Sequence, residues 1–350
     1  MAKNNLIILV HGMGTYEAGT MTKEVKDGLD AALKFAGHDF DYMQDVEFYE
    51  HNFGIILDEI RKAESEALAE FGKLGIEKSV INNINQYASG LSSDKFFYTH
   101  LLDVIYYGLT FWGERLRSHF IDDFITKMLA SKKSGQKVHV LGYSLGTALI
   151  NDAFSKIYRS GNVDDEHLST AHHKVDHYWS IANVSRILHE LNDIDGANPT
   201  SNVVHDGVGG CVKKMTLVSH KYDPLMQIKP YARQPQNGRF QRPSGITKIN
   251  THDLNGYLSH PDVGLRLIAD IYGGDAGIDG DMLRKGIENH KNATVNSDID
   301  GLEDKWQHVV DSLNDPSGAI DSVKVLNEAV NAFREKIKAL IDDVTPEDGK

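Results

Sequence analysis

A short segment around Ser144 restricts the fold of this chain more than any other feature of its sequence. The sequence GYSLG at 142–146 follows an apolar run at 138–141 and precedes a second one at 147–150. This pattern is typical of a strand that turns sharply into a helix, with the serine in the turn. The serine of such a turn has a strained backbone, and the glycines on either side leave room for the adjoining strand and helix. We therefore expect the Ser144 hydroxyl to lie at the positive, N-terminal end of the helix.

A second motif lies near the start of the chain. The apolar run at 6–10 continues directly into the sequence HGMG at 11–14. A strand without polar residues suits a parallel sheet that is covered on both faces. Glycines at the end of such a strand let the chain turn so that a backbone N–H points at a reacting group. We expect the backbone N–H groups of Met13 and Leu145 to form an oxyanion hole, which stabilises negative charge on a substrate oxygen.

These two motifs, in this order, resemble those of the lipase and esterase branch of the α/β-hydrolase family. The resemblance spans residues 5–270 and implies a mostly parallel sheet with helices on both faces. It also implies a carboxylate after a later strand and a histidine after the last one. Asp223 follows a predicted strand at 214–219, and His252 follows a predicted short strand at 246–251.

The resemblance implies a role for each of these three residues. Ser144 attacks the carbonyl carbon of an ester, and His252 takes the hydroxyl proton and returns it to the leaving group. Asp223 holds the histidine in the required tautomer and favours its charged form. Water then breaks down the acyl-serine intermediate, and this chemistry needs no cofactor.

The substrate implied by the resemblance is a small-molecule or lipid ester, and we expect His11, Gly12 and Tyr143 to contact it. The same triad also serves thioesterases, amidases and acyltransferases, so the sequence leaves the acyl bond open. A hydrolase fold can also be used for binding alone, but such a fold has usually lost part of its triad.

More than one residue is a candidate for the catalytic histidine, because the chain contains 17 histidines. His252 is favoured because a strand end can fix its approach to the serine. His260 is the main rival, although Pro261 after it indicates the entry to a helix; His220 is another candidate. A further cluster, His172, His173 and His177, lacks the cysteine or carboxylates of a typical metal site, and we expect no metal.

Charge and cysteine content narrow the possible partners and the compartment. The net charge of −13 argues against binding to nucleic acid or to anionic membrane surfaces. No stretch reaches the ~20 apolar residues of a membrane-spanning helix, so we expect no integral membrane segment. The single cysteine, Cys211, cannot form an internal disulfide, and the first strand begins too close to Met1 for a secretory signal. These features predict a cytoplasmic protein.

Alternating strand and helix patterns predict an α/β-hydrolase domain over residues 1–272. Further strands are expected at 45–49 and 176–184, and a sheet-covering helix at 22–35. Residues 51–130 form a predicted helical insertion with many aromatic residues. We interpret the insertion as a cap whose inner face binds an apolar acyl chain, although packed helices with an aromatic core would give the same pattern.

Residues 273–350 are predicted to form a C-terminal helical extension. A glycine-rich break at 273–280 precedes amphipathic segments, and the last of these, at 323–341, has an apolar stripe at helical spacing. That stripe must be buried. Packing onto the hydrolase domain is the expected arrangement, and a homodimer formed through the C-terminal helices is the alternative.

Overall fold

Six parallel strands form one sheet in the part of the chain that the structure describes. This computed structural model describes residues 3–12, 17–52, 111–158, 168–186, 203–224, 226, 231, 233–248, 250–295, 302–313, 332 and 335–339. The strand order is β2-β1-β3-β4-β5-β6, and every neighbouring pair is parallel. The strands are β1 (Asn5–Val10), β2 (Val46–His51), β3 (Lys137–Tyr143), β4 (Val175–Ile181), β5 (Val212–Val218) and β6 (Arg239–Gln241).

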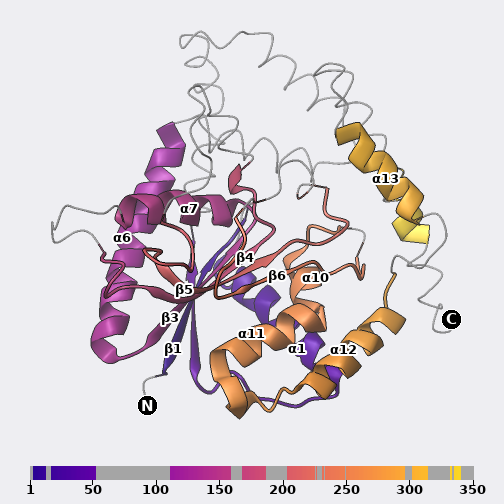
Figure 1. Cartoon of the computed structure of the whole chain (residues 1–350), viewed down its shortest axis with the longest axis horizontal. Coiled ribbons are helices and arrows are strands. Elements are labelled where there is room, and N and C mark those ends of the chain that lie inside the picture. Colours follow the sequence, from indigo (N-terminus) through magenta and orange to yellow (C-terminus); the bar gives the residue numbers. More distant parts are fainter. Residues whose placement is uncertain are drawn as a thin grey trace, which may run out of the picture.

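Helices cover both faces of this sheet (Figure 1). On one face, α6 (Phe111–Ser134) packs on α7 (Leu145–Ile157), and both contact β3. On the other face, α1 (Thr20–Ala36) contacts α10 (Leu254–Ser259), α11 (Pro261–Tyr272) and α12 (Gly280–Asn292). A short 3₁₀ helix, η1 (Gly273–Ala276), joins α11 to α12, and α13 (Leu302–Leu313) follows. The predicted α/β class with helices on both faces is confirmed.

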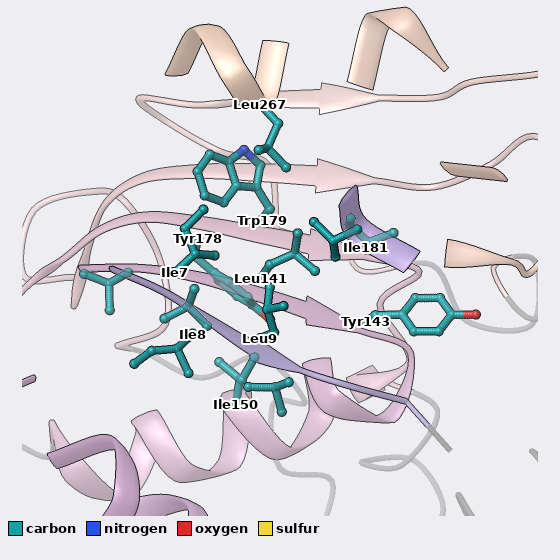
Figure 2. Close-up of a cluster of buried hydrophobic side chains, with 14 of the residues drawn as sticks. Ile7, Ile8, Leu9, Leu141, Tyr143, Ile150, Tyr178, Trp179, Ile181 and Leu267 are labelled. Carbon is teal, nitrogen blue, oxygen red and sulfur yellow. The ribbon is translucent and has the colours of Figure 1, made fainter. Parts of the chain in front are cut away.

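The main core lies on both sides of the central strands, because successive side chains of a strand point to opposite faces. Figure 2 shows Trp179 of β4 beside Leu267 of α11 on one face and Ile150 of α7 on the other. All six residues of β1 are buried, as its apolar sequence predicts for a sheet covered twice. Each fully buried large apolar side chain stabilises the fold by about 1.5–3 kcal/mol relative to an exposed one.

The predicted final strand at 246–251 is wrong. The last strand in the described part is β6, which pairs with β5 from Thr216 to Val218. Ile246 forms an isolated antiparallel bridge with Val295 outside the sheet, and none of the described residues that follow it up to His252 is in a strand. The side chain of Ile246 is buried against Val295 in a second apolar cluster, which accounts for its apolar character without a strand. His252 therefore lies in a turn before α10 and not at a strand end.

Most of the predicted insertion at 51–130 lies outside the described residues. Its last part, from Phe111, belongs to α6, which packs on α7 and so contributes to the layer over the sheet. In the predicted C-terminal extension, α12 packs on α1 and α11. Of the predicted helix at 323–341, the structure describes 332 and 335–339, which are helical.

Among the helices that the structure describes, none has the length and apolar character needed to cross a membrane.

Candidate active site

Ser144 occupies a strained turn between β3 and α7. Its backbone has φ 52° and ψ −124°, a conformation that a residue with a side chain adopts at a cost of about 1–3 kcal/mol. The residue caps α7, and its backbone N–H donates to the Ile181 carbonyl at the end of β4 (3.0 Å). The strain predicted from the sequence is therefore present at the serine itself.

The glycines around Ser144 are required by close packing. A Cβ on Gly142 would lie 2.5 Å from Cδ1 of Ile150 in α7, and a Cβ on Gly146 would collide with the carbonyl oxygen of Val10 in β1. A Cβ on Gly12, in the turn after β1, would lie 2.8 Å from Cβ of Ser144. The expected collision with the adjoining helix and strand is confirmed, and the Gly12 turn lies directly against the serine.

Ser144, His252 and Asp223 form a continuous hydrogen-bonded chain. Nε2 of His252 lies 2.9 Å from Oγ of Ser144, and Nδ1 of His252 lies 2.6 Å from Oδ2 of Asp223. A carboxylate accepts hydrogen bonds and does not donate them, so this contact places the proton on Nδ1 and leaves Nε2 as an acceptor for the serine hydroxyl. The three residues come from the segments after β3, β5 and β6, which meet at the carboxyl edge of the parallel sheet.

The three side chains are shielded from solvent. The exposed fraction is 1% for Ser144, 2% for His252 and 0% for Asp223. In such an environment water screens charges weakly, so the ionic hydrogen bond between the carboxylate and the imidazole is stronger than it would be at the surface.

The other two candidate histidines, His260 and His220, form hydrogen bonds with backbone groups. Nδ1 of His260 accepts a hydrogen bond from the Asp262 backbone and so caps α11, as Pro261 indicated. Burial lowers the pKa of His260 to about 4. His220 contacts the Gly245 carbonyl through Nε2 (3.1 Å), and burial lowers its pKa as well. The structure thus places His252 beside Ser144, whereas His260 caps α11 and His220 bonds to the Gly245 carbonyl.

Tyr257 joins this site although nothing in its sequence position indicated it. Its hydroxyl donates to Oδ2 of Asp223 (2.5 Å) and accepts from the His220 backbone N–H (3.2 Å). The side chain is fully buried, and burial raises the pKa of Tyr257 well above its usual value, so the hydroxyl keeps its proton at neutral pH. Tyr257 lies on α10, five residues after His252, and its contact with Asp223 is recognisable only in the three-dimensional structure.

Of the two backbone donors expected for an oxyanion hole, Leu145 is described and Met13 lies outside the described residues. Leu145 is the first residue of α7, and the first amides of a helix have no acceptor within that helix. His11 is buried, and its Nδ1 lies 2.8 Å from the Gly12 carbonyl oxygen. Burial lowers the pKa of His11 to about 4, so the ring is neutral at pH 7.

Tyr143, which we expect to contact substrate, forms a hydrogen bond with the segment that carries His252 (the histidine segment). Its hydroxyl donates to the backbone carbonyl of His252, and the two rings lie 5.3 Å apart. Figure 2 shows its side chain extending from the carboxyl end of β3, away from the core residues around it. This contact fixes the backbone of His252, whereas contact with a substrate stays a prediction for Tyr143, His11 and Gly12.

Ala182, a second residue with a strained backbone, lies directly after β4 and near the turn at Ser144. Ala182 has φ 51°, and its N–H donates to the Val218 carbonyl (2.9 Å). Two residues later, the Val184 N–H donates to Oγ1 of Thr147, and that hydroxyl donates to the Ser144 carbonyl (2.6 Å). The turn after β4 is therefore tied to the first turn of α7, a link that the sequence did not reveal.

The comparisons with known proteins give no relative. No protein-family model, curated protein or solved structure matches this chain. The residues and their geometry are therefore the basis for any inference about function.

A cavity of about 130 Å³ lies at the carboxyl ends of β4 and β5. Ser180 and Asn183 line it on the β4 side, and Leu217, Met226 and Phe240 give it a largely apolar wall. The two β4-side residues flank Ile181, the residue whose carbonyl accepts the Ser144 N–H. The cavity thus adjoins the strand end that holds the serine turn.

The histidine cluster at 172–177 is not gathered around a common point. His177 lies in β4 and contacts Thr216 Oγ1 through Nε2 (2.8 Å), and His173 accepts a hydrogen bond from the Ser169 backbone. Within the described ranges, no group of three or more histidine, cysteine, aspartate or glutamate residues could hold a metal ion.

Proposed function

We propose that this chain is a serine hydrolase of the α/β-hydrolase type that cleaves carboxylic esters. The observation that carries the proposal is the chain of hydrogen bonds from Ser144 through His252 to Asp223, at 2.9 and 2.6 Å. Those distances lie within the reach that proton transfer between a nucleophile and its base requires. The strained backbone at Ser144 supports the same conclusion, because strain of this kind gathers at functional sites.

The reaction begins when the Ser144 hydroxyl attacks the ester carbonyl carbon and its proton passes to Nε2 of His252. The resulting oxyanion is stabilised by the backbone N–H of Leu145 and, in this proposal, by that of Met13. The C–O bond to the alcohol then breaks, and His252 returns its proton to the leaving alkoxide. Water attacks the acyl-Ser144 ester with His252 as base, and this releases the acid and restores the serine.

Asp223 makes His252 effective in both steps. Its carboxylate accepts from Nδ1, so Nε2 is left free of a proton and faces the serine. The negative charge also stabilises the imidazolium that forms during each transfer. The Tyr257 hydroxyl donates a hydrogen bond to the same carboxylate oxygen. We assign Tyr257 a positioning role, because in this proposal it acts on the reaction through Asp223 and His252.

The assignment to the α/β-hydrolase fold draws support from the topology. The serine, the carboxylate and the histidine follow one another along the chain in the order of that family, and each follows a strand of a parallel sheet. The turn after β1, with Gly12 against Ser144, lies where the family has its second oxyanion donor.

A thioesterase or an acyltransferase would use the same three residues, and a binding protein would not need them. The intact geometry favours catalysis over binding alone. Esters are preferred here because the lipase-like motifs that carry the resemblance belong to ester hydrolases.

Hydrolysis of a series of p-nitrophenyl esters, with matched thioesters and amides, tests the proposal. We expect ester turnover, and a loss of about 10³-fold or more in kcat for Ser144→Ala and for His252→Gln. Ser155→Ala is the matched control, because Ser155 lies on the same helix and bonds to the Asn151 carbonyl. Its rate should stay within about twofold of the wild type, since the change removes one half-buried hydrogen bond within α7. Turnover that survives Ser144→Ala, or a folded protein that cleaves none of these compounds, contradicts the proposal.

A further inference from the structure

A second apolar cluster lies apart from the main core and contains the neighbour of the proposed catalytic acid. We call it the C-terminal cluster. Its members come from the segment around Asp223 (the acid segment), the segment before His252, the residues just after α12, and the C-terminal helices. They are Tyr222, Ile246, Val295, Leu302, Trp306, Val309 and Ile337.

Tyr222 anchors the acid segment in this cluster. Its ring is fully buried and packs edge-on against Trp306 of α13, with the ring centroids 5.5 Å apart and an interplanar angle of 88°. Edge-to-face contacts between aromatic rings fix orientation as well as distance. Because Asp223 is the next residue, a displacement of the Tyr222 ring moves the backbone from which the carboxylate extends.

Tyr222 also ties the acid segment to the histidine segment. Its carbonyl accepts a hydrogen bond from Oγ1 of Thr251 (2.6 Å), and Thr251 immediately precedes His252. Its backbone N–H donates to Nδ1 of His220 (3.2 Å). The residue beside the acid and the residue beside the base are therefore directly bonded, and both depend on where the Tyr222 side chain is held.

The same cluster holds the chain that leads to His252. Ile246 and Val295 exchange two backbone hydrogen bonds (2.7 and 3.2 Å), which join the segment after β6 to the residues that follow α12. Both side chains are buried in the C-terminal cluster. The acid segment and the histidine segment thus share one apolar support, which lies outside the sheet that positions Ser144.

We infer that Trp306 is a positioning residue: through Tyr222 it holds Asp223 and His252 in the geometry that the proposed hydrolysis requires. The C-terminal extension then helps to position the proposed triad. The inference rests on the proposed function for its effect on rate. Its structural content, the Asp223–His252 contact, can be measured separately.

Trp306→Ala tests the inference, with Trp306→Phe as the conservative variant. Phe124→Ala is the matched control, because it removes a buried aromatic ring from the main core on α6, next to Phe154. A misplacement of about 1 Å can cost ~10²-fold in rate, so we expect kcat of Trp306→Ala to fall by about 10- to 100-fold with little change in KM. Trp306→Phe should recover most of the rate, and Phe124→Ala should retain the wild-type kcat below its melting temperature.

The rate–pH curve separates positioning from loss of folded protein. A carboxylate that is held less well stabilises the imidazolium less, so the acid limb of the curve should move to lower pH in Trp306→Ala. A smaller fraction of folded enzyme would lower the rate at every pH by the same factor and would not change the pH at which the acid limb falls. If Trp306→Ala does not fold, Val309→Ala, a smaller deletion in the same cluster, should show the same displacement to a lesser extent.

A spectroscopic measurement makes the inference independent of activity. The Nδ1 proton shared by His252 and Asp223 should give a low-field proton NMR signal that His252→Gln abolishes. We expect that signal to be retained in Phe124→Ala and to be lost or broadened in Trp306→Ala. If the wild type shows the signal and cleaves no ester, the proposed function fails and the inference stands on the spectra. An unchanged signal and an unchanged rate–pH curve in Trp306→Ala, or in Val309→Ala if the former does not fold, overturn the inference.

Discussion

The carboxylate of Asp223 illustrates how single contacts define this site. Its Oδ2 accepts from both His252 and Tyr257, and the Tyr257 hydroxyl in turn accepts from the His220 backbone. Hydrogen bonds to an ionised group contribute about 1.5–3 kcal/mol, roughly twice the value for neutral pairs. Tyr257 therefore restricts the direction in which the carboxylate can rotate and holds it toward the imidazole.

Replacing Tyr257 with phenylalanine should weaken catalysis without abolishing it. The ring remains, but Oδ2 of Asp223 loses one donor, and we expect kcat/KM to fall about 10-fold, equivalent to ~1.4 kcal/mol of transition-state stabilisation. Steady-state ester hydrolysis measures this effect. Tyr42→Phe is the control, since it removes a similar bond to Asp30 on α1 (2.8 Å). If Tyr257→Phe has the wild-type rate, or if the control loses as much, Tyr257 has no role in positioning.

Some of these residues could be predicted from the sequence and others could not. The glycines around Ser144 were recognisable because a strained turn imposes a local requirement, the absence of a side chain at fixed spacing. Tyr257 and Ala182 gave no such signal. A hydrogen bond from a tyrosine on α10 to a carboxylate after β5 depends on how the two elements meet, and no spacing along the chain encodes it.

At the scale of elements, α1 and α10 meet beside the histidine segment through a crowded set of carboxylates. Burial, together with the neighbouring Asp253 at the N-cap of α10, raises the pKa of Glu24 on α1 to about 7. Lys248, which pairs with Asp253, acts in the opposite direction. Glu24 is thus protonated more readily in the folded protein than in the unfolded chain.

This raised pKa gives a pH dependence of stability with a definite sign. Glu24 contributes stability in its protonated form, which is present in full below its unfolded pKa and is lost as pH rises through about 7. Glu24→Gln should therefore become more stable relative to the wild type between pH 5 and pH 8, by about 1 kcal/mol at most, because the side chain is partly exposed and screened. Urea unfolding at the two pH values measures this. Glu47→Gln, at an exposed position of β2, should show no such trend; an equal trend in both variants, or none in Glu24→Gln, contradicts the assignment.

The error in the final strand also belongs to the scale of elements. The residues at 246–251 include several that are β-branched and therefore favour a strand, yet Ile246 is buried against Val295 in a cluster that forms outside the sheet. The three-residue β6 is too short for its alternation to stand out, and it is defined by pairing with β5. A pattern in the sequence can indicate that a residue is buried, but it does not show which partner buries it.

For the whole molecule, buried histidines predict sensitivity to acid. Burial lowers the pKa of His11 and His139 to about 4, of His290 to about 3 and of His177 to about 2. The unfolded chain binds these protons near pH 6.5, so between pH 6.5 and the folded pKa values the unfolded state takes up more protons and stability falls as pH falls. Each histidine contributes up to about 1.36 kcal/mol per pH unit in that range.

The free energy of unfolding should therefore decrease from pH 7 to pH 5. In His177→Gln its slope against pH should be smaller, by the amount that corresponds to the uptake of about one proton on unfolding. The loss of the net charge of −13 on acidification acts the other way by relieving repulsion, so the comparison of the two slopes is the informative quantity. Chemical denaturation at several pH values measures both. Parallel slopes for the wild type and His177→Gln contradict the depressed pKa of this ring.

The α/β class and the parallel sheet could be predicted because they follow from repeated local patterns of strand and helix. The arrangement of the C-terminal extension could not be predicted to the same degree. An apolar stripe shows that a helix face is covered, and the structure adds that Trp306 of α13 covers Tyr222 beside the acid. This long-range contact joins residues 84 positions apart, by the difference of their numbers.

The central claim is that Ser144 is a nucleophile activated by His252, and its reaction with a fluorophosphonate measures this most directly. With the adduct located by mass spectrometry of peptides, we expect stoichiometric modification of Ser144 in the wild type and none in Ser144→Ala. Labelling should be slowed about 100-fold or more in His252→Gln, which removes the base. A folded wild-type protein whose Ser144 remains unmodified, or one that is labelled equally fast without the imidazole, would contradict it.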